Sequence, residues 1–278
     1  MFSDYTDFEN DKLNGWENPA ELKFAGPTGN RFLEYASPSA EPETLLRKSI
    51  ALKGNTHYFF AARLRLREDE GGRYVNYLVN DTPVPLWPLE PSDWHAYDSR
   101  HFVLNDSSQV SLQYHGGKKG LDIDDLLVSE IDLTDFKGEY LNGWVLRDDY
   151  RLEFRDNDIE GKMLYIFTYP DIGHSGLFLH KPVTGLKVGG KYKFLMRVGA
   201  VNALNPAELQ LKIIYPDNTA QPVGVAKIVN QLGKWEDHSG TFTATGAEGR
   251  LEIHNATNTS NGNDFTISRL EFYQVIEL

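Results

Sequence analysis

The sequence predicts an all-β protein made of two tandem antiparallel β-sandwich domains, with residues 1–131 in the first and 132–278 in the second. The first observation is a repeat: the stretch Asp7 to Trp16 returns at Asp135 to Trp144, with Asp, Phe, Leu, Asn, Gly and Trp in the same places. A repeat at this distance is typical of a duplicated domain. The second is that short apolar runs of period two alternate with Gly and Pro, and the third is that no segment shows the period of an amphipathic helix.

Composition supports strands and narrows the class of partner. Tyr (14) and Phe (15) far outnumber Met (3), which favours strands over helices. The formal net charge of −12 opposes binding to a phosphate backbone, so no nucleic-acid partner is expected. No apolar run is long enough to span a bilayer, so no membrane insertion is expected. The absence of Cys excludes disulfides and thiol chemistry.

In the first copy, the clearest strand is His57 to Arg67, because its side chains alternate between two faces. One face is apolar and carries Tyr58, Phe60, Ala62, Leu64 and Leu66, while the other carries Arg63, Arg65 and Arg67. Shorter strands are expected at residues 21–24, 31–35, 45–52, 73–80, 101–104, 109–114 and 121–128. The segment 83–91 contains four prolines, so it cannot form a central strand.

The second copy repeats this order. Strands are expected at residues 191–198, 208–215, 241–244, 250–254 and 265–275. The closing strand of each copy shows the same shift in its apolar alternation: Leu121 and Ile123 give way to Leu126 and Val128, as Phe265 and Ile267 give way to Leu270 and Phe272. A shift at the same place in both copies predicts a β-bulge. Core packing is the expected role of the four tryptophans at repeated positions, Trp16, Trp94, Trp144 and Trp235.

The recurring residues resemble those of jelly-roll carbohydrate-binding modules of the galactose-binding-like type. The first copy has Phe8-Glu9, Gly15-Trp16, Trp94, Phe102 and the closing run Ile123-Asp124-Asp125-Leu126. The second keeps Phe136, Gly143-Trp144, Trp235 and Phe242, with Lys137 in place of Glu9 and Ser268-Arg269 in place of Asp124-Asp125. The resemblance implies glycan binding of a lectin-like, bacterial kind, outside the cell and within a larger secreted protein, although no signal peptide is expected at the start of the chain.

The resemblance also implies a structural calcium ion where the first and last strands of the first copy meet. Glu9, Asp124 and Asp125 stand at the matching positions, and Ca²⁺ prefers oxygen ligands. The alternative is that these carboxylates are solvated or hydrogen-bonded at a strand end. In the second copy Lys137 and Arg269 replace two of the carboxylates. Positive charge opposes a divalent cation, so no metal is expected there.

Sugar-binding residues are expected among aromatic side chains outside the repeat. Trp87 has no counterpart in the second copy and lies in the Pro-rich segment, where a pre-ordered indole can stack on a sugar at low entropic cost. The residues expected to join it are His95, Tyr97 and Tyr114. In the second copy the expected residues are Tyr169, His174 and Tyr215. The alternative for Trp87 is that it closes a sandwich edge or an interdomain seam.

The sequence gives little support to catalysis. The run Gly173-His174-Ser175-Gly176 lacks the spacing of a nucleophile elbow. Asp69-Glu70 and Asp148-Asp149 are the acidic pairs that a glycosidase would need, yet adjacent charged residues in loops are usually solvated. A non-catalytic glycan-binding protein is therefore predicted, and the alternative is a structural or protein-interaction module of a toxin, an adhesin or another large secreted protein.

Overall fold

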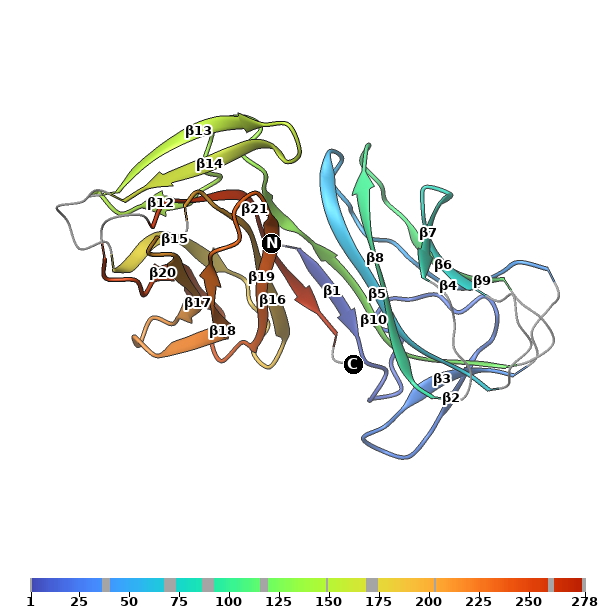
Figure 1. Cartoon of the computed structure of the whole chain (residues 1–278). Coiled ribbons are helices and arrows are strands. Elements are labelled where there is room, and N and C mark those ends of the chain that lie inside the picture. The colour runs from blue at the N-terminus through green and yellow to red at the C-terminus, as the bar shows by residue number, and fades with distance from the viewer. Residues whose placement is uncertain are drawn as a thin grey trace. The chain divides into compact units, whose positions relative to one another are not determined.

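The computed structural model describes residues 2–36, 41–67, 74–86, 93–115, 120–148, 150–168, 175–202, 204–259 and 263–276. Strands are the regular elements of this part of the chain, which contains no helix, so the all-β prediction is confirmed (Figure 1). No helix able to cross a membrane occurs in these ranges. The predicted residues Trp87, Tyr169 and His174 lie outside them, as do Asp69, Glu70 and Asp149.

The chain divides into two compact units. The first runs to Ile131 and includes the last residues from Gln274, and the second is Asp132–Tyr273. Each unit is a sandwich of two antiparallel sheets around its own apolar core. Each half of the chain therefore buries a complete core of its own.

The first unit has a six-stranded and a four-stranded sheet. The six-stranded sheet has the order β2-β3-β10-β5-β8, with β1 also paired to β10. Its strands are β1 (Ser3–Thr6), β2 (Lys23–Ala25), β3 (Phe32–Tyr35), β5 (Thr56–Leu66), β8 (His95–Val103) and β10 (Leu121–Glu130). The second sheet has the order β4-β9-β6-β7. Its strands are β4 (Glu43–Lys48), β6 (Tyr74–Val79), β7 (Thr82–Leu86) and β9 (Val110–His115).

The second unit repeats this arrangement with six and five strands. Its six-stranded sheet has the order β13-β14-β21-β16-β19, with β11 paired to β21. These strands are β11 (Asp132–Thr134), β13 (Arg151–Asn157), β14 (Gly161–Phe167), β16 (Lys191–Ala200), β19 (Trp235–Thr243) and β21 (Phe265–Val275). The other sheet has the order β12-β15-β20-β17-β18. Its strands are β12 (Val145–Leu146), β15 (Gly176–Thr184), β17 (Ala207–Ile214), β18 (Ala220–Val229) and β20 (Glu248–Asn255).

The repeated stretch forms the same turn in both units. Phe8 and Phe136 have positive φ angles of 56° and 58°, and both rings are buried. The Asn-Gly pair that follows also has positive φ in each copy, at Gly15 (87°) and Gly143 (81°). This conformation is easily reached by Asn and Gly and turns the chain sharply. The turn delivers the next indole, Trp16 or Trp144, into the core at 3% and 5% exposure.

Two expectations about the strands have different outcomes. The bulge predicted in the first closing strand is confirmed, because the register of β10 against β5 shifts between Ile123 and Leu126. No strand is predicted from residues 220–229, yet β18 forms there as the last strand of its sheet. Pro222 interrupts the sequence pattern of a strand, and an edge is where a sheet tolerates proline.

Candidate functional site

The outer face of the four-stranded sheet in the first unit presents aromatic and amide side chains together. On β6 the core receives Val75, Tyr77 and Val79, so Tyr74 and Asn76 point to the other side. Gln113 and His115 stand on the same side of β9 by the same alternation. Tyr74 is directly opposite His115 in the ladder, and their rings stack with centroids 4.3 Å apart and planes 14° apart. We call these four residues the Tyr74 face.

One short hydrogen bond holds the imidazole of the Tyr74 face in place. His115 Nε2 donates to Gln113 Oε1 at 2.7 Å, and Asn76 Nδ2 lies 3.4 Å from the same nitrogen. Burial lowers the pKa of His115, so the ring is neutral at pH 7. A neutral ring stacked on a phenol, beside two amides, is a surface of aromatic and hydrogen-bonding groups without net charge.

The matching sheet of the second unit carries charge on its outer face. Glu252 on β20 is 3% exposed, and its carboxylate lies 2.5 Å from Arg250 Nη2 and 2.6 Å from His254 Nε2. Burial is the main cause of the lowered pKa of His254, partly opposed by its bond to Glu252. His180 is the residue opposite Glu252 on β15, and burial lowers its pKa as well. The two units therefore present different chemistry on the same face.

The described residues among the predicted sugar-binding set are not brought together. His95 and Tyr97 are neighbours on β8, with ring centroids 6.0 Å apart, but β8 belongs to the other sheet of the unit. Tyr114 is 1% exposed and packs edge-on against Tyr35 in the core. Tyr215 is 5% exposed, and its hydroxyl accepts a bond from the Thr245 amide. Tyr114 is enclosed in the core, whereas Tyr215, although mostly buried, lines a cavity of about 350 Å³ beside Pro216.

The residues of the Tyr74 face were not selected from the sequence, although a signal was present. Tyr114 falls on the same face of the strand as the core residues Val110 and Leu112, which predicts an inward ring, whereas Gln113 and His115 fall on the opposite face. Tyr74 and Asn76 likewise alternate with core residues of β6. Strand alternation does not predict the register between two strands. The register of β6 against β9 places Tyr74 beside His115.

The residues predicted to bind calcium lie in an acidic neighbourhood of the first unit. The carboxylate of Asp125 accepts a bond from Tyr5 Oη at 2.5 Å, and Arg63 Nη1 lies 3.4 Å from Asp124 and 3.9 Å from Asp125. Burial, followed by the charge of Asp125, raises the pKa of Asp124 to about 7. Glu9 accepts the Arg31 amide through Oε1, while its buried Oε2 has no hydrogen-bond partner among the described residues.

The chemistry of this neighbourhood fits a calcium ion in part. The charges of Asp7 and Glu9 both act on Asp124 and Asp125, so four carboxylates influence one another. Oxygen donors and excess negative charge are what Ca²⁺ requires. Within the described ranges, however, no group of three or more acidic or His side chains is close enough to hold a metal. Calcium therefore remains a prediction for Glu9, Asp124 and Asp125.

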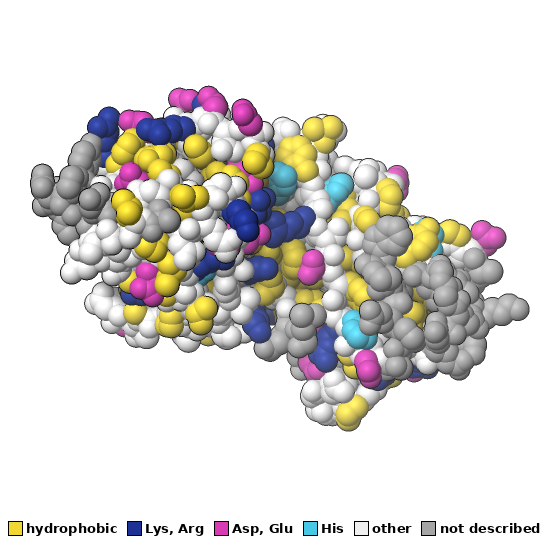
Figure 2. Space-filling view, in the orientation of Figure 1, with side chains coloured by type: hydrophobic (Ala, Val, Ile, Leu, Met, Phe, Trp, Pro, Cys, Tyr) yellow, Lys and Arg dark blue, Asp and Glu magenta, His cyan; other side chains and the backbone are white. Residues whose placement is uncertain are grey.

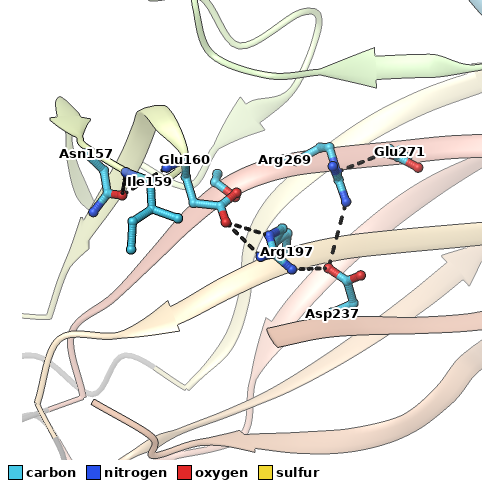
Figure 3. Close-up of polar contacts among 8 residues, drawn as sticks. Asn157, Ile159, Glu160, Arg197, Asp237, Arg269 and Glu271 are labelled. Carbon is cyan, nitrogen blue, oxygen red and sulfur yellow. Dashed lines mark hydrogen bonds and ion pairs between the residues drawn. The ribbon is translucent and has the colours of Figure 1, made fainter. Parts of the chain in front are cut away.

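At the corresponding place in the second unit an ionic network is formed by the protein itself (Figure 3). Arg197 Nη2 lies 2.7 Å from Glu160 and Nη1 lies 3.1 Å from Asp237. Arg269 lies 2.8 Å from Glu271 and 3.9 Å from Asp237. The positive charge at this place thus comes from two arginines.

Lys137 does not take part in this network. Its side chain is 77% exposed and pairs with Asp135 at 3.1 Å. Ser268, which replaces Asp124, donates to Glu160 at 3.1 Å. Arg197 and Arg269 place positive charge beside Ser268, which opposes a divalent cation. The absence of a metal in the second unit stays a prediction.

Comparisons with known proteins find similarity of structure and not of sequence. No protein-family model and no curated protein matches the chain. The tandem CBM22-1–CBM22-2 domain of Xyn10C from Paenibacillus barcinonensis is 12% identical, with a TM-score of 0.45 over 98% of this chain and 97% of that one. A xylan-binding domain from CBM22 is 11% identical, with a TM-score of 0.40 over 52% and 95%. The sugar-binding C-terminal domain of EclA is 25% identical, with a TM-score of 0.36 over 51% and 97%.

Two of these similarities are to CBM22 carbohydrate-binding modules, the type of module that the repeated residues resemble. All three TM-scores are below 0.5, so these similarities carry no argument about this chain. The ligands of those proteins are not thereby assigned to this chain, whose binding chemistry has to be argued from its own residues.

Proposed function

We propose that the chain is a non-catalytic carbohydrate-binding protein and that the Tyr74 face of the first unit is its main sugar-binding surface. The observation that carries the proposal is the stacked Tyr74–His115 pair flanked by the amides of Gln113 and Asn76. Sugar rings have apolar C–H faces and hydroxyl edges. An aromatic ring next to fixed amide groups meets both requirements at once.

Recognition by this face requires no chemistry beyond stacking and hydrogen bonding. The Tyr74–His115 contact fixes both rings before a ligand arrives, which lowers the entropy lost on binding. A shallow face of this kind gives modest affinity for one sugar. The affinity for a polymer increases if the chain engages it at more than one place.

A structural calcium ion in the first unit is part of the same proposal. Glu9, Asp124 and Asp125 would hold it, and its role would be to neutralise carboxylates that burial and mutual repulsion destabilise. Arg63 now shares these carboxylates, so metal binding would compete with the guanidinium.

Titration calorimetry and a glycan array with the full chain test the sugar-binding proposal. The solved modules described as xylan-binding make xylohexaose a first probe, beside cello- and galacto-oligosaccharides. His115→Ala and Tyr74→Ala are expected to weaken binding at least about tenfold, the usual effect of removing a central aromatic contact. His180→Ala, on the charged face of the second unit, is the matched control and is expected to bind like the wild type. Wild-type affinity in both Tyr74-face variants would contradict the proposal.

The alternative function is a protein contact. It is favoured by exposed apolar residues on and after the edge strand β18, where Val225 is 83%, Ile228 53% and Leu232 58% exposed. If the wild-type chain bound no glycan, a contact with another domain of a larger secreted protein would be the better explanation. Val225→Ser and Ile228→Ser would then be the variants to examine in the parent assembly.

A further inference from the structure

A cavity of about 290 Å³ lies on the outer face of the six-stranded sheet in the second unit, away from the sheet whose face was described above. Trp235 and Tyr165 supply its aromatic surface, and Arg155, Asn157 and Thr266 supply polar atoms. Ligand pockets usually measure about 300–1,000 Å³, so this one is of the size for a small ring or the end of a chain. All of its lining residues belong to the second unit.

The cavity depends on a glycine. Gly199 on β16 is opposite Trp235 on β19, and the indole lies directly on its backbone. A Cβ atom at residue 199 would come within 3.0 Å of Thr266 Oγ1 and 3.3 Å of the indole ring. The absence of a side chain therefore allows Trp235 to lie flat against the strand and leaves room above the sheet.

The first unit has filled the same position. Arg65 on β5 corresponds to Gly199, and its guanidinium lies 4.7 Å from the ring centroid of Trp94, the counterpart of Trp235. Arg65 Nη2 also lies 2.7 Å from Asp122, a fully buried carboxylate that stands where the second unit has Thr266. Both tryptophans were expected in the core, yet neither is fully buried. In the first unit Arg65 covers the indole of Trp94. In the second unit Gly199 has no side chain, so the indole of Trp235 is left available.

The polar groups around Trp235 are held in fixed directions. Asn157 Oδ1 accepts bonds from the amides of Ile159 (2.9 Å) and Glu160 (3.0 Å), so its Nδ2 is left to donate (Figure 3). Arg155 is paired with Glu153 at 2.9 Å and lies 3.8 Å from the Tyr165 ring centroid. Figure 2 shows dark-blue cationic side chains lying beside yellow hydrophobic ones over β13 and β14. Arg155 is already paired with a carboxylate, and Lys234 also lines the cavity.

We propose that this cavity is a second sugar-binding site, which takes one pyranose ring of an oligosaccharide against Trp235 and is present in the second unit only. The proposal rests on carbohydrate binding as the function of the chain and places a site on the other sheet, separate from the Tyr74 face. The indole stacks on the C–H face of the ring, and Asn157 Nδ2 donates to a hydroxyl group. Arg65 blocks the equivalent stacking on Trp94.

Indole Nε1–H signals in NMR spectra of the full chain test this site directly. The chain has five tryptophans, so each signal can be assigned from single Trp→Phe variants. Xylohexaose, cellohexaose and a galacto-oligosaccharide are added in turn. The expected result is a saturable shift of the Trp235 signal, with the Trp94 signal unchanged, and the same shift in the His115→Ala chain. Trp235→Ala and Asn157→Ala are expected to weaken this binding at least about tenfold, while Trp94→Ala leaves it unchanged.

The outcomes separate this site from the Tyr74 face. A Trp235 signal that stays in place while the His115→Ala chain loses binding would overturn the second site and leave the first. Gly199→Ala adds the methyl group that the indole and Thr266 exclude, so wild-type binding in that folded variant would also count against the cavity. A wild-type chain that bound none of the three oligosaccharides would overturn both sites. Thermal unfolding of each variant shows whether a loss of binding is only a loss of fold.

Discussion

Acid should destabilise the second unit through one histidine. His238 on β19 is 4% exposed, and its Nε2 has no hydrogen-bond partner among the described residues. Burial, with a smaller contribution from the charge of Lys227, lowers the pKa of His238 from 6.5 to about 4, and a backbone hydrogen bond with Leu209 opposes this only partly. A folded-state pKa below the unfolded value means that the stability is present above pH 6.5 and is lost as the pH falls toward 4.

The size of this loss follows from the two pKa values. The difference between 6.5 and about 4, at about 1.36 kcal/mol for each pH unit, gives about 3 kcal/mol at pH 4. Many single domains are stable by only about 5–15 kcal/mol. Protonation of one imidazole therefore removes a large part of the free energy of unfolding of this unit.

A double difference isolates the histidine from other titrating groups. Urea unfolding of the wild type and of His238→Gln is measured at pH 7.5, 5.5 and 4. Amide hydrogen exchange in β16 and β19 is the probe that reports on the second unit. The free energy of unfolding of the wild type is expected to fall by about 3 kcal/mol more than that of the variant. Parallel curves for the two proteins over this pH range would refute the reasoning.

Three further predictions concern the cores and the metal. Trp144→Ala should lower the free energy of unfolding of the second unit by about 3–5 kcal/mol, because the indole is 5% exposed and stacks on Phe194 with ring centroids 5.7 Å apart. Urea unfolding measures this loss. A loss below about 1 kcal/mol would contradict the role of Trp144 in the core. Asp122→Asn leaves Arg65 and Arg67 without their buried carboxylate, so the first unit should lose about 1–3 kcal/mol, less than for a fully buried pair because both guanidinium groups are partly exposed. A urea denaturation midpoint of Asp122→Asn equal to that of the wild type would refute this estimate for the contacts of Asp122 with the two arginines. Calorimetry with Ca²⁺ should find one site per chain that Asp124→Asn removes, and two equal sites would show that the arginines of the second unit do not exclude the metal.

Most of the fold could be predicted from the sequence because strand alternation is a local property. The segment from His57 to Arg67 alternates between apolar and charged residues, which predicts its inward and outward faces. The observed strand β5 has these faces. The shift in the closing strand was likewise visible and is the bulge between Ile123 and Leu126. Strands β13, β14, β15 and β18 were not predicted. In β18 the side chains do not alternate clearly, and its place at a sheet edge is decided by its partner β17.

The candidate sites were harder to predict because they depend on pairs of residues from different strands. Tyr74 and His115 become a stacked pair only through the register of β6 against β9. Trp235 is an ordinary core candidate until the strand beside it is known to carry Gly199. Aromatic character alone led to Tyr114, whose position in the alternation of β9 places it in the core. Composition identifies the residues able to bind sugar, and only cross-strand neighbours show which of them are available.

The charge difference between the two closing strands also bears on how a duplicated chain avoids folding incorrectly. Two units with the same strand order offer each closing strand two places to pair, and such exchange is a common failure of tandem repeats. Arg63 faces Asp124 in β10, and the strand β21 in its place would bring Arg269 toward a like charge. We expect this repulsion to disfavour β21 in the first unit, so that the first half of the nascent chain closes with its own strand.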